Sequence, residues 1–509
     1  MTKINPNADR DFLNNIDLLV ENNFPKYLKA LKFNNFKHID KLNIEFKHPI
    51  SIIAGTNRSG KSTVLMALAC SHLDFQKRNP RNGKLERNTW SSLMKFTAHD
   101  KQTSDWNYSI TYKTGRKTET KNGRRKKLTR KWSGIGKKES QIKNRQVIFI
   151  DLDRIIPARF YSSKILRLAK KAHIDNKIDD FTEIEKFISY ILEEDFKLDK
   201  VAHHLDKDIF KYNSNNVYSS YNAASGEDVL TRIIIDAVEA KKDSLILIDE
   251  IEMGLHPKIQ RRLIDILFYI SRHNNKQFIL TTHSPTILAS VPKESRIFIE
   301  KNNNNNYRAI KNISVNAALS KMDSKAYPLI DIYCEDDVAK TIINKAITAI
   351  GKEKKLNHFS DLINIIISGN ANDTYNNFKA HQRTYKTRKI KCGCVCILDG
   401  DMQKEKKGDK LQYPSERELH FLYSDKCPES FLTEFYLSQY PNEAIKYHLG
   451  SSNPHCLFDK IIENSHFISK EEVFEKCWDC FLKMKKGVKY FDELKNFVFE
   501  MAKKYSPEL

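Results

Sequence analysis

The chain has 509 residues, with 86 Lys and Arg against 64 Asp and Glu, and a formal net charge of +22. This length excludes a single ordinary core and predicts two or three domains. The positive charge favours nucleic acid or another polyanion as a partner, and a general Lys- and Asn-rich composition is the alternative explanation.

Two further classes are excluded by composition. No apolar run approaches the roughly 18 residues that a membrane-spanning helix needs, and the first residues lack the apolar core of a secretory signal. We therefore expect a cytoplasmic protein without a membrane partner. Nine cysteines at irregular positions do not form a disulfide framework in a chain of this length.

Residues 1–26 are polar and predict a short helix or an extended arm. From Tyr27, apolar and polar residues alternate in three short runs. This pattern is typical of an antiparallel strand pair that leads into the next motif.

That motif is a complete phosphate-binding loop, G-T-N-R-S-G-K-S, from Gly55 to Ser62. Residues 49–54 before it are apolar like a buried strand, and residues 63–69 after it have helical spacing. The glycines let backbone N–H groups turn toward phosphates, Lys61 reaches the β- and γ-phosphates, and the Ser62 hydroxyl is a magnesium ligand. ATP and Mg²⁺ are the expected cofactors.

Together with the strands before it, this loop resembles the opening of an ABC-type ATPase head of the kind found in SMC, RecF and OLD-family proteins. The resemblance assigns nucleotide contacts within the loop to Gly55, Asn57, Gly60, Lys61, Ser62 and Thr63.

The most basic stretch runs from Lys113 to Lys138, with twelve Lys or Arg, one acid (Glu119), and Trp132 among the charges. One interpretation is a solvated hairpin tip. The other is a finger that follows phosphates, in which cations displace counterions and Trp132 stacks on a base.

Between the phosphate loop and the next ATPase motif there is no long heptad run, which argues against a coiled-coil arm of the SMC type. Segments such as DDFTEIEKFISYILEEDF predict short helices of a helical lobe instead.

At Ala224 the chain reads A-S-G-E before a helical pattern, which resembles the ABC signature with Ser225, Gly226 and Glu227 at the matching positions. Farther on, SLILIDE predicts a buried parallel strand that ends in Asp249 and Glu250. The strand end places Asp249 near magnesium and Glu250 where it can polarise an attacking water.

The next two segments also resemble this class of ATPase. IEMGLHP is similar to its D-loop region, with Ile251 where proline is common. QFILTTHSP predicts a strand that ends at His283, the position of the switch histidine that senses the γ-phosphate. No Q-loop glutamine is assigned.

In this class the signature of one subunit closes over the nucleotide of another. The chain has one set of motifs, so the resemblance implies a homodimer of ATPase heads with twofold symmetry, and higher oligomers are compatible with it.

A second domain is expected beyond residue 320. Residues 296–313 predict a hairpin with Asn302–Asn306 at its tip, and YPLIDIYCEDDVAK then predicts a strand ending in Glu335 followed by a helix. KCGCVCILDGDMQ predicts another strand, which ends in Asp399 and Asp401.

This order of strand-end acids resembles the Toprim domain of OLD-family nucleases, in which Glu335, Asp399 and Asp401 would hold divalent metal. Asp336 stands where these domains usually have glycine. Glu429 and Glu434 are alternatives for a further ligand. An α/β domain whose acids are structural is the other interpretation.

Two cysteine groups need an assignment. Cys392, Cys394 and Cys396 alternate along a strand and are expected to pack as small apolar residues on one face. The helical pair Cys477 and Cys480 is expected to face a core. A zinc site that joins this pair to His455 and Cys456 is the alternative.

The predicted fold is α/β: an ABC-type ATPase head with a mixed sheet and helical lobe (27–320, with the basic insertion at 113–138), a smaller Toprim-like domain (321–440) and a helical C-terminal region (441–509) after the arm at 1–26. The order of the two resemblances is that of the OLD family. It implies an ATP-regulated endonuclease of prokaryotic anti-phage defence that uses Mg²⁺ or Mn²⁺ on DNA. The alternative is an ATPase sensor or scaffold, similar to the Septu PtuA subunit, that controls a separate nuclease or toxin partner of the defence system.

Overall fold

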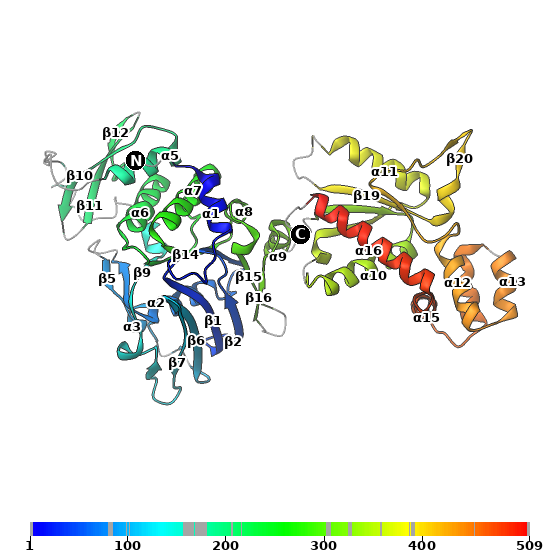
Figure 1. Ribbon diagram of the computed structural model, residues 1–509, viewed down its shortest axis with the longest axis horizontal. Coiled ribbons are helices and arrows are strands. Elements are labelled where there is room, and N and C mark those ends of the chain that lie inside the picture. The colour runs from blue at the N-terminus through cyan, green and yellow to red at the C-terminus, as the bar shows by residue number, and fades with distance from the viewer. Residues whose placement is uncertain are drawn as a thin grey trace. The chain divides into compact units, whose positions relative to one another are not determined.

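The computed structural model describes residues 4–79, 85–97, 99–100, 102–155, 167, 170, 181–204, 207–214, 216–301, 307–323, 328–356, 359–385, 387, 392–451 and 453–505. The chain divides into two compact units, residues 1–318 and 319–509 (Figure 1). Each unit contains a sheet of its own. In the described part of the chain, no helix combines the length and apolar character needed to cross a membrane.

The first unit is built on an eight-stranded mixed sheet. Its six inner strands are parallel to one another, and an antiparallel strand closes each edge. Every residue of its three central strands is buried, which explains their continuous apolar runs. The strands in sheet order are β16 (Tyr307–Lys311), β15 (Arg296–Lys301), β3 (Ile50–Gly55), β14 (Gln277–Thr282), β13 (Leu245–Ile248), β9 (Ile142–Ile150), β4 (His72–Arg78) and β5 (Leu85–Arg87).

Helices pack around this sheet. Helix α2 begins at the end of the phosphate loop, and α6 begins at Ser225 within A-S-G-E. Helix α1 lies against α7 through ion pairs of Asp9 with Arg272 and of Arg10 with Asp265. The helices of this unit are α1 (Pro6–Asn14), α2 (Lys61–Cys70), α3 (Trp90–Leu93), α5 (Thr182–Leu192), α6 (Ser225–Glu239), α7 (Pro257–Asn274) and α8 (Pro285–Ala289); α9 (Val315–Asp323) spans the boundary between the two units.

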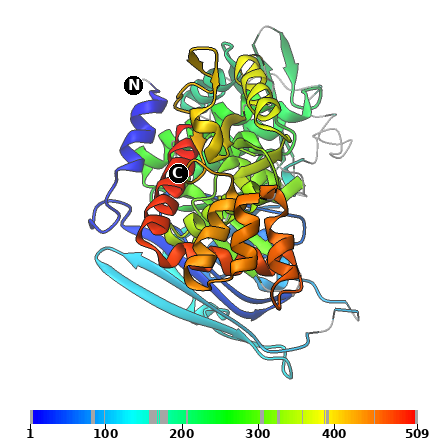
Figure 2. The ribbon, with the colours of Figure 1, turned by 90° about the vertical axis from the view of Figure 1, so that its right-hand side faces the viewer.

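A second, antiparallel sheet confirms the strand pair expected before the phosphate loop. Its order is β2-β1-β6-β7-β8, and β6 and β7 form a long hairpin, light blue in Figure 2. Its inner face joins the core beneath α2. The strands are β1 (Lys26–Phe36), β2 (Ile39–Glu45), β6 (Trp106–Thr114), β7 (Lys117–Arg125) and β8 (Trp132–Gly134).

The expected helical lobe is only partly helical. Between α2 and α6 the longest described helix is α5, and no coiled-coil arm is present among the described residues there. An antiparallel meander follows α5, formed by β10 (Lys197–His204), β11 (Lys207–Asn213) and β12 (Val217–Ser219). Helix α5 confirms the short helix predicted within DDFTEIEKFISYILEEDF, whereas the strands of the meander were not predicted.

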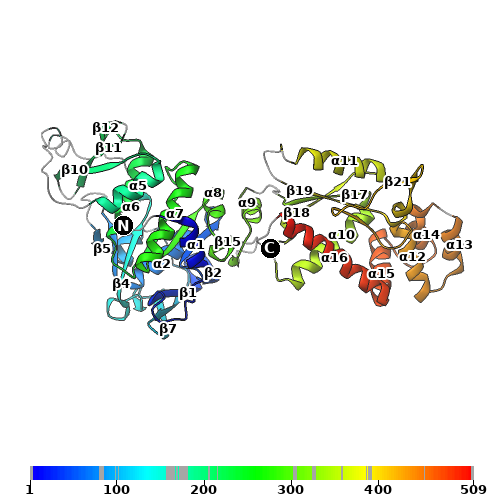
Figure 3. The same cartoon turned by 45° about the horizontal axis from the view of Figure 1, so that its top comes forward.

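The second unit has a four-stranded, wholly parallel sheet in the order β18-β17-β19-β22. Helix α11 covers one face, while α10 and α16 cover the other (Figures 1 and 3). The elements are β17 (Ile330–Cys334), α10 (Asp337–Glu353), β18 (Ile363–Ile367), α11 (Ala371–Thr384), β19 (Gly393–Leu398), β22 (Leu419–Phe421) and α16 (Lys485–Tyr505), with a small hairpin of β20 (Lys406–Lys407) and β21 (Lys410–Leu411).

Four helices that precede α16 in the chain form a bundle; the first of them are orange in Figure 2. They are α12 (Pro428–Gln439), α13 (Glu443–Ser451), α14 (Leu457–Glu463) and α15 (Lys470–Lys483). Short 3₁₀ turns occur at Lys138–Ser140, Leu152–Ile155, Lys293–Ser295, Phe359–Leu362, Gly400–Lys404 and Pro454–Cys456. The expected hairpin of β15 and β16 forms, but its tip at Asn302–Asn306 lies outside the described residues.

The nine cysteines are free thiols. Cys394 and Cys396 belong to the core between β19 and α11, which confirms their expected packing on one face of a strand. Cys477 and Cys480 are buried within α15, also as expected. Cys392 is buried at the start of the same strand segment as Cys394.

Candidate functional site

The phosphate loop connects the buried end of β3 to the first turn of α2. Gly60 precedes the helix with φ +96°, and a Cβ there would lie 2.6 Å from Ile39 Cδ1, so only glycine fits this turn. Of the other assigned loop residues, Asn57 is exposed, Ser62 is half-buried and Thr63 is buried. The free N–H groups at the start of α2 can therefore bind an anion.

Lys61 is held in place by the loop itself. Its Nζ donates to the carbonyl oxygens of Gly55, at 3.0 Å, and Thr56, at 3.1 Å. Burial lowers its pKa, while nearby carboxylates oppose this shift. Ser59 is also buried, and its Oγ has no hydrogen-bond partner among the described residues. A buried cation and an unpaired hydroxyl beside a helix N-terminus fit a phosphate group.

The acids predicted at the end of β13 lie near this lysine. Asp249 accepts a hydrogen bond from Thr281 Oγ1 at 2.5 Å, and the same hydroxyl accepts one from the Glu250 N–H at 2.8 Å. Glu250 has φ +46°, a left-handed conformation that is uncommon for a glutamate. Asp249 and Glu250 both raise the Lys61 pKa electrostatically, so the structure brings the two predicted motifs together.

His283 follows β14 on the same edge of the sheet. Burial and the positive charge of Lys61 lower its pKa, while Glu252, Glu250 and Asp249 oppose the shift. The lowered pKa favours the neutral form of the imidazole.

Two residues of this site were not found from the sequence. Arg154 donates to the carbonyl oxygens of Asp249, at 2.8 Å, and Glu250, at 2.5 Å. Glu252 accepts from the His283 N–H at 2.5 Å and from Thr282 Oγ1 at 2.7 Å. Arg154 has no local signal because its partners lie about a hundred residues away, whereas the acid at 252 could have been noticed beside the predicted strand end.

The signature residues lie at the N-terminus of α6, where Gly226 packs against Gly254 in the turn that follows β13. A Cβ at Gly226 would lie 2.3 Å from the Gly254 carbonyl oxygen, so this close approach requires glycine. Glu227 accepts a hydrogen bond from the Tyr218 hydroxyl, and burial raises its pKa. Ser225 is the first residue of the helix.

In the second unit, the structure brings Glu335 and Asp399 into contact. They follow the adjacent parallel strands β17 and β19, and Glu335 Oε1 accepts a hydrogen bond from the Asp399 N–H at 2.7 Å. Asp399 is 4% exposed, and its Oδ1 has no hydrogen-bond partner among the described residues. A buried carboxylate oxygen without a donor fits a cation.

Burial and mutual repulsion raise the pKa values of this group. The pKa of Asp399 rises to about 9, first through burial and then through Glu335, Asp336 and Asp401. The pKa of Glu335 rises to about 7, mainly through burial, and burial also raises the pKa of Asp401. The cluster thus favours bound protons or cations over free negative charge.

The alternatives for a further acid are distinguished by position. Glu429 lies in α12 and is buried, and its Oε1 is 3.0 Å from His455 Nδ1. Glu434 instead pairs with Lys426 near the surface. Among the described side chains, Asp336, Glu429 and His455 form a group that could hold a metal ion.

The alternative zinc site is wrong in its ligands. Cys456 is exposed, whereas Cys477 and Cys480 are buried in α15. His455 faces Glu429, and the metal-competent group found among the described residues contains no cysteine. A helical C-x-x-C that packs into a core cannot turn both thiols toward an exposed turn.

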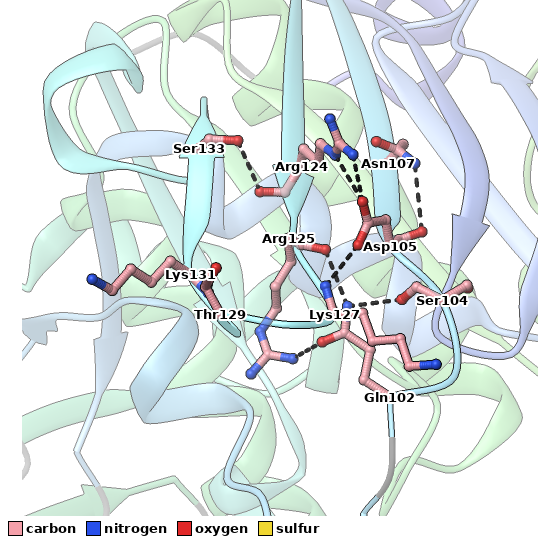
Figure 4. A network of polar contacts seen from close by, with 10 residues as sticks. All are labelled: Gln102, Ser104, Asp105, Asn107, Arg124, Arg125, Lys127, Thr129, Lys131 and Ser133. Atoms are coloured by element: carbon pink, nitrogen blue, oxygen red, sulfur yellow. Dashed lines mark hydrogen bonds and ion pairs between the residues drawn. The ribbon is translucent and has the colours of Figure 1, made fainter.

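The basic stretch from Lys113 to Lys138 begins at the end of β6 and contains the β7–β8 hairpin with its turn, which Figure 4 shows. Asp105 holds the turn by accepting from the Lys127 N–H at 2.7 Å and from the Arg124 side chain. Arg125 is buried over the rings of Phe96 and Trp106, at 4.3 and 5.2 Å from their centroids.

Trp132 does not serve as a free stacking platform. Its ring stacks on Trp90 with centroids 4.2 Å apart and contacts Phe36, Trp106 and Tyr108. The expectation that it stacks on a base is wrong, because this aromatic cluster already occupies its face. The exposed cations Lys126, Lys127, Arg130 and Lys131 remain at the turn.

Comparison with known proteins gives a family match that lies within the first unit. Residues 50–289 match the family described as "AAA domain, putative AbiEii toxin, Type IV TA system". The first unit carries an ATPase-type domain. This ATPase-type domain contains the phosphate loop, the Asp249–Glu250 strand end and His283.

Other similarities cover smaller parts or are more distant. The chain is 32% identical over 123 residues to "Retron Vc95 probable ATPase" of Vibrio cholerae serotype O1 biovar El Tor, which is 22% of this chain and 23% of that protein. It thus matches under a quarter of that curated relative. The SMC head domain from Thermotoga maritima covers 56% of this chain and 98% of its own, with 14% identity and a TM-score of 0.34. The recombination mediator RecF covers the same shares, with 14% identity and a TM-score of 0.31.

Proposed function

We propose that the protein is an ATP-regulated, metal-dependent DNA endonuclease of a prokaryotic anti-phage defence system. The observation that carries this proposal is the contact of Glu335 with Asp399 at the ends of adjacent parallel strands, in an acid cluster with raised pKa values. Phosphodiester cleavage at such a cluster is the reaction that its charge supports best.

At the proposed cleavage site, three acids would bind the metal. Glu335, Asp399 and Asp401 would hold Mg²⁺ or Mn²⁺; Asp399 is buried, Glu335 is half-buried, and Asp401 is exposed and open to solvent and substrate. A divalent ion bound there generates a nucleophilic water and neutralises the leaving oxygen of a phosphodiester. The hydrogen bond of Glu335 to the Asp399 N–H fixes the two carboxylates in register before substrate arrives.

The ATPase-type domain supplies regulation. Lys61 and the N–H groups of the phosphate loop bind the β- and γ-phosphates, and Ser62 with Asp249 would hold the magnesium of ATP. Glu250 would accept a proton from the attacking water, and His283 would contact the γ-phosphate. Arg154 holds the backbone of Asp249 and Glu250 in position for these roles.

The assembly is a homodimer of ATPase domains. Ser225, Gly226 and Glu227 begin α6 beside the Gly254 turn, where they would close over the nucleotide of a second subunit. The role in defence is supported by the matched family description and by the similarity to a retron ATPase.

The deciding experiment is plasmid cleavage by the purified chain with Mg²⁺ or Mn²⁺, with and without ATP. Wild-type protein is expected to nick or linearise the plasmid. Asp399→Ala with Asp401→Ala should abolish cleavage and leave ATP turnover within about twofold, since the altered acids lie in the other unit. Cleavage that survives this double substitution contradicts the nuclease proposal.

A second candidate is an ATPase sensor that controls a separate nuclease or toxin. It is favoured by Asp336, which adds a carboxylate where Toprim domains usually have glycine, and by the family match, which lies within the first unit. Robust ATP turnover without cleavage under all metal conditions would select this candidate.

A further inference from the structure

Three side chains from separate segments meet beside the proposed cleavage site. Asp336 precedes α10, Glu429 lies in the first turn of α12, and His455 lies in the 3₁₀ turn before α14. One donor atom from each lies within 4.8 Å of the other two. Donor atoms around one ion, each roughly 2.1 Å from it, lie up to about 4.2 Å apart, so small side-chain rotations suffice.

The buried glutamate of this group has one carboxylate oxygen without a partner among the described residues. The Glu429 side chain is 5% exposed. Its Oε1 meets His455, but its Oε2 has no hydrogen-bond partner among the described residues. An unpaired carboxylate oxygen in a buried position is costly, and a cation bound between the three side chains would remove that cost.

We propose that Asp336, Glu429 and His455 form a binding site for a divalent transition-metal ion, with Zn²⁺ or Mn²⁺ as the ions of suitable chemistry. An imidazole and two carboxylates are ligands that these ions accept, whereas Mg²⁺ prefers oxygen ligands alone. The group of Glu335, Asp399 and Asp401 offers only oxygen and suits Mg²⁺.

The surroundings allow both entry and retention of the ion. The His455 side chain is 61% exposed, so it provides the route from solvent. Asp336 is fixed because one of its oxygens caps α10 by accepting from the Ala339 N–H at 2.8 Å. A bound ion would join the start of α10 to α12 and to the turn before α14, and thereby fasten the helical bundle to the sheet of the second unit.

This inference goes beyond the proposed nuclease, since metal binding is measured directly and requires no cleavage. The full chain, stripped with chelator and dialysed, is titrated with Zn²⁺ and separately with Mg²⁺ by calorimetry. His455→Asn should remove one Zn²⁺ per chain or weaken its binding at least tenfold, and should leave Mg²⁺ binding within twofold. Asp336→Asn should weaken Zn²⁺ similarly, since asparagine keeps the helix cap but loses the charge.

Two controls test specificity. His466→Asn removes another exposed histidine, and Cys456→Ser removes the thiol next to His455; both should bind Zn²⁺ as the wild type does. Circular dichroism checks that each variant is folded. If His455→Asn does not fold, Asp336→Asn decides the question through the Zn²⁺-dependent rise in melting temperature, which it should lose.

Wild-type Zn²⁺ stoichiometry and affinity in both His455→Asn and Asp336→Asn would overturn the inference and leave Glu429 and His455 as an ion pair only. That result does not affect the nuclease proposal, which depends on Asp399 and Asp401. Conversely, His455-dependent Zn²⁺ binding without any plasmid cleavage would support the metal site and contradict the nuclease proposal.

Discussion

The burial of Asp399 has a consequence for stability. Its folded-state pKa of about 9 lies above the unfolded value of about 3.9, so protonation stabilises the fold below pH 4 and this contribution is lost as pH rises toward 9. Asp399→Asn cannot ionise. Without metal, we expect the free energy of unfolding of this variant to exceed that of the wild type by a margin that grows with pH, by about 1–3 kcal/mol between pH 5 and pH 9.

Urea unfolding in EDTA across this pH range measures the difference. Asp425→Asn, at an acid that pairs with Lys404 near the surface, is the matched control and should show no such trend. Addition of Mg²⁺ should restore the stability of the wild-type protein at high pH. A constant difference between wild type and Asp399→Asn at every pH would contradict the predicted burial of the charge.

Substitutions at Lys61 and Glu250 should affect ATP binding and ATP hydrolysis separately. Lys61→Ala removes the cation at the phosphate loop and should weaken ATP binding roughly 100-fold or more. Glu250→Gln should leave binding intact and slow hydrolysis roughly 10²–10⁴-fold. Filter binding and phosphate release measure the two quantities. Wild-type turnover in Glu250→Gln would remove its role as general base.

Among the elements, the β7–β8 hairpin carries the candidate nucleic-acid contacts, although not all of its basic residues are available. Arg125 packs on aromatic rings and Arg124 binds Asp105, so both support the hairpin itself. The exposed set comprises Lys126, Lys127, Arg130 and Lys131.

Reversal of these four exposed cations to Glu should weaken DNA binding and lower the salt slope by about one for each lost phosphate contact. The reason is that each contact releases a condensed counterion. Fluorescence anisotropy over a salt titration provides the measurement. Reversal of Lys241 and Lys242, exposed after α6, serves as the control. An unchanged slope in the hairpin variant would identify the hairpin as a solvated tip.

For the whole molecule, the central prediction is a nucleotide site shared between two copies of the chain. Lys61→Ala and Ser225→Arg should each abolish ATP turnover. Random mixing of equal amounts yields half heterodimers, in each of which one of two sites is intact, so the mixture should recover about a quarter of wild-type turnover. No recovery, with both variants folded and exchanging subunits, would exclude the composite site.

Several features followed from the sequence because their signals are local. The phosphate loop needs glycine, lysine and serine in one short stretch between a buried strand and a helix. The runs SLILIDE, QFILTTH and CGCVCILD predict strands because buried parallel strands are continuously apolar. Acids directly after such runs must lie at the carboxyl edge of a sheet, which is why Asp249 and Asp399 could be singled out.

The tertiary structure decided which of these residues have partners, since such partners come from segments far apart in the chain. Packing buried Glu429 beside His455, left Glu434 paired with Lys426 near the surface, and stacked the partly buried Trp132 on Trp90. It also placed Arg154 against the backbone of the β13 end. Sequence periodicity reports which face of an element is buried, but only the packing of one element on another determines what that face meets.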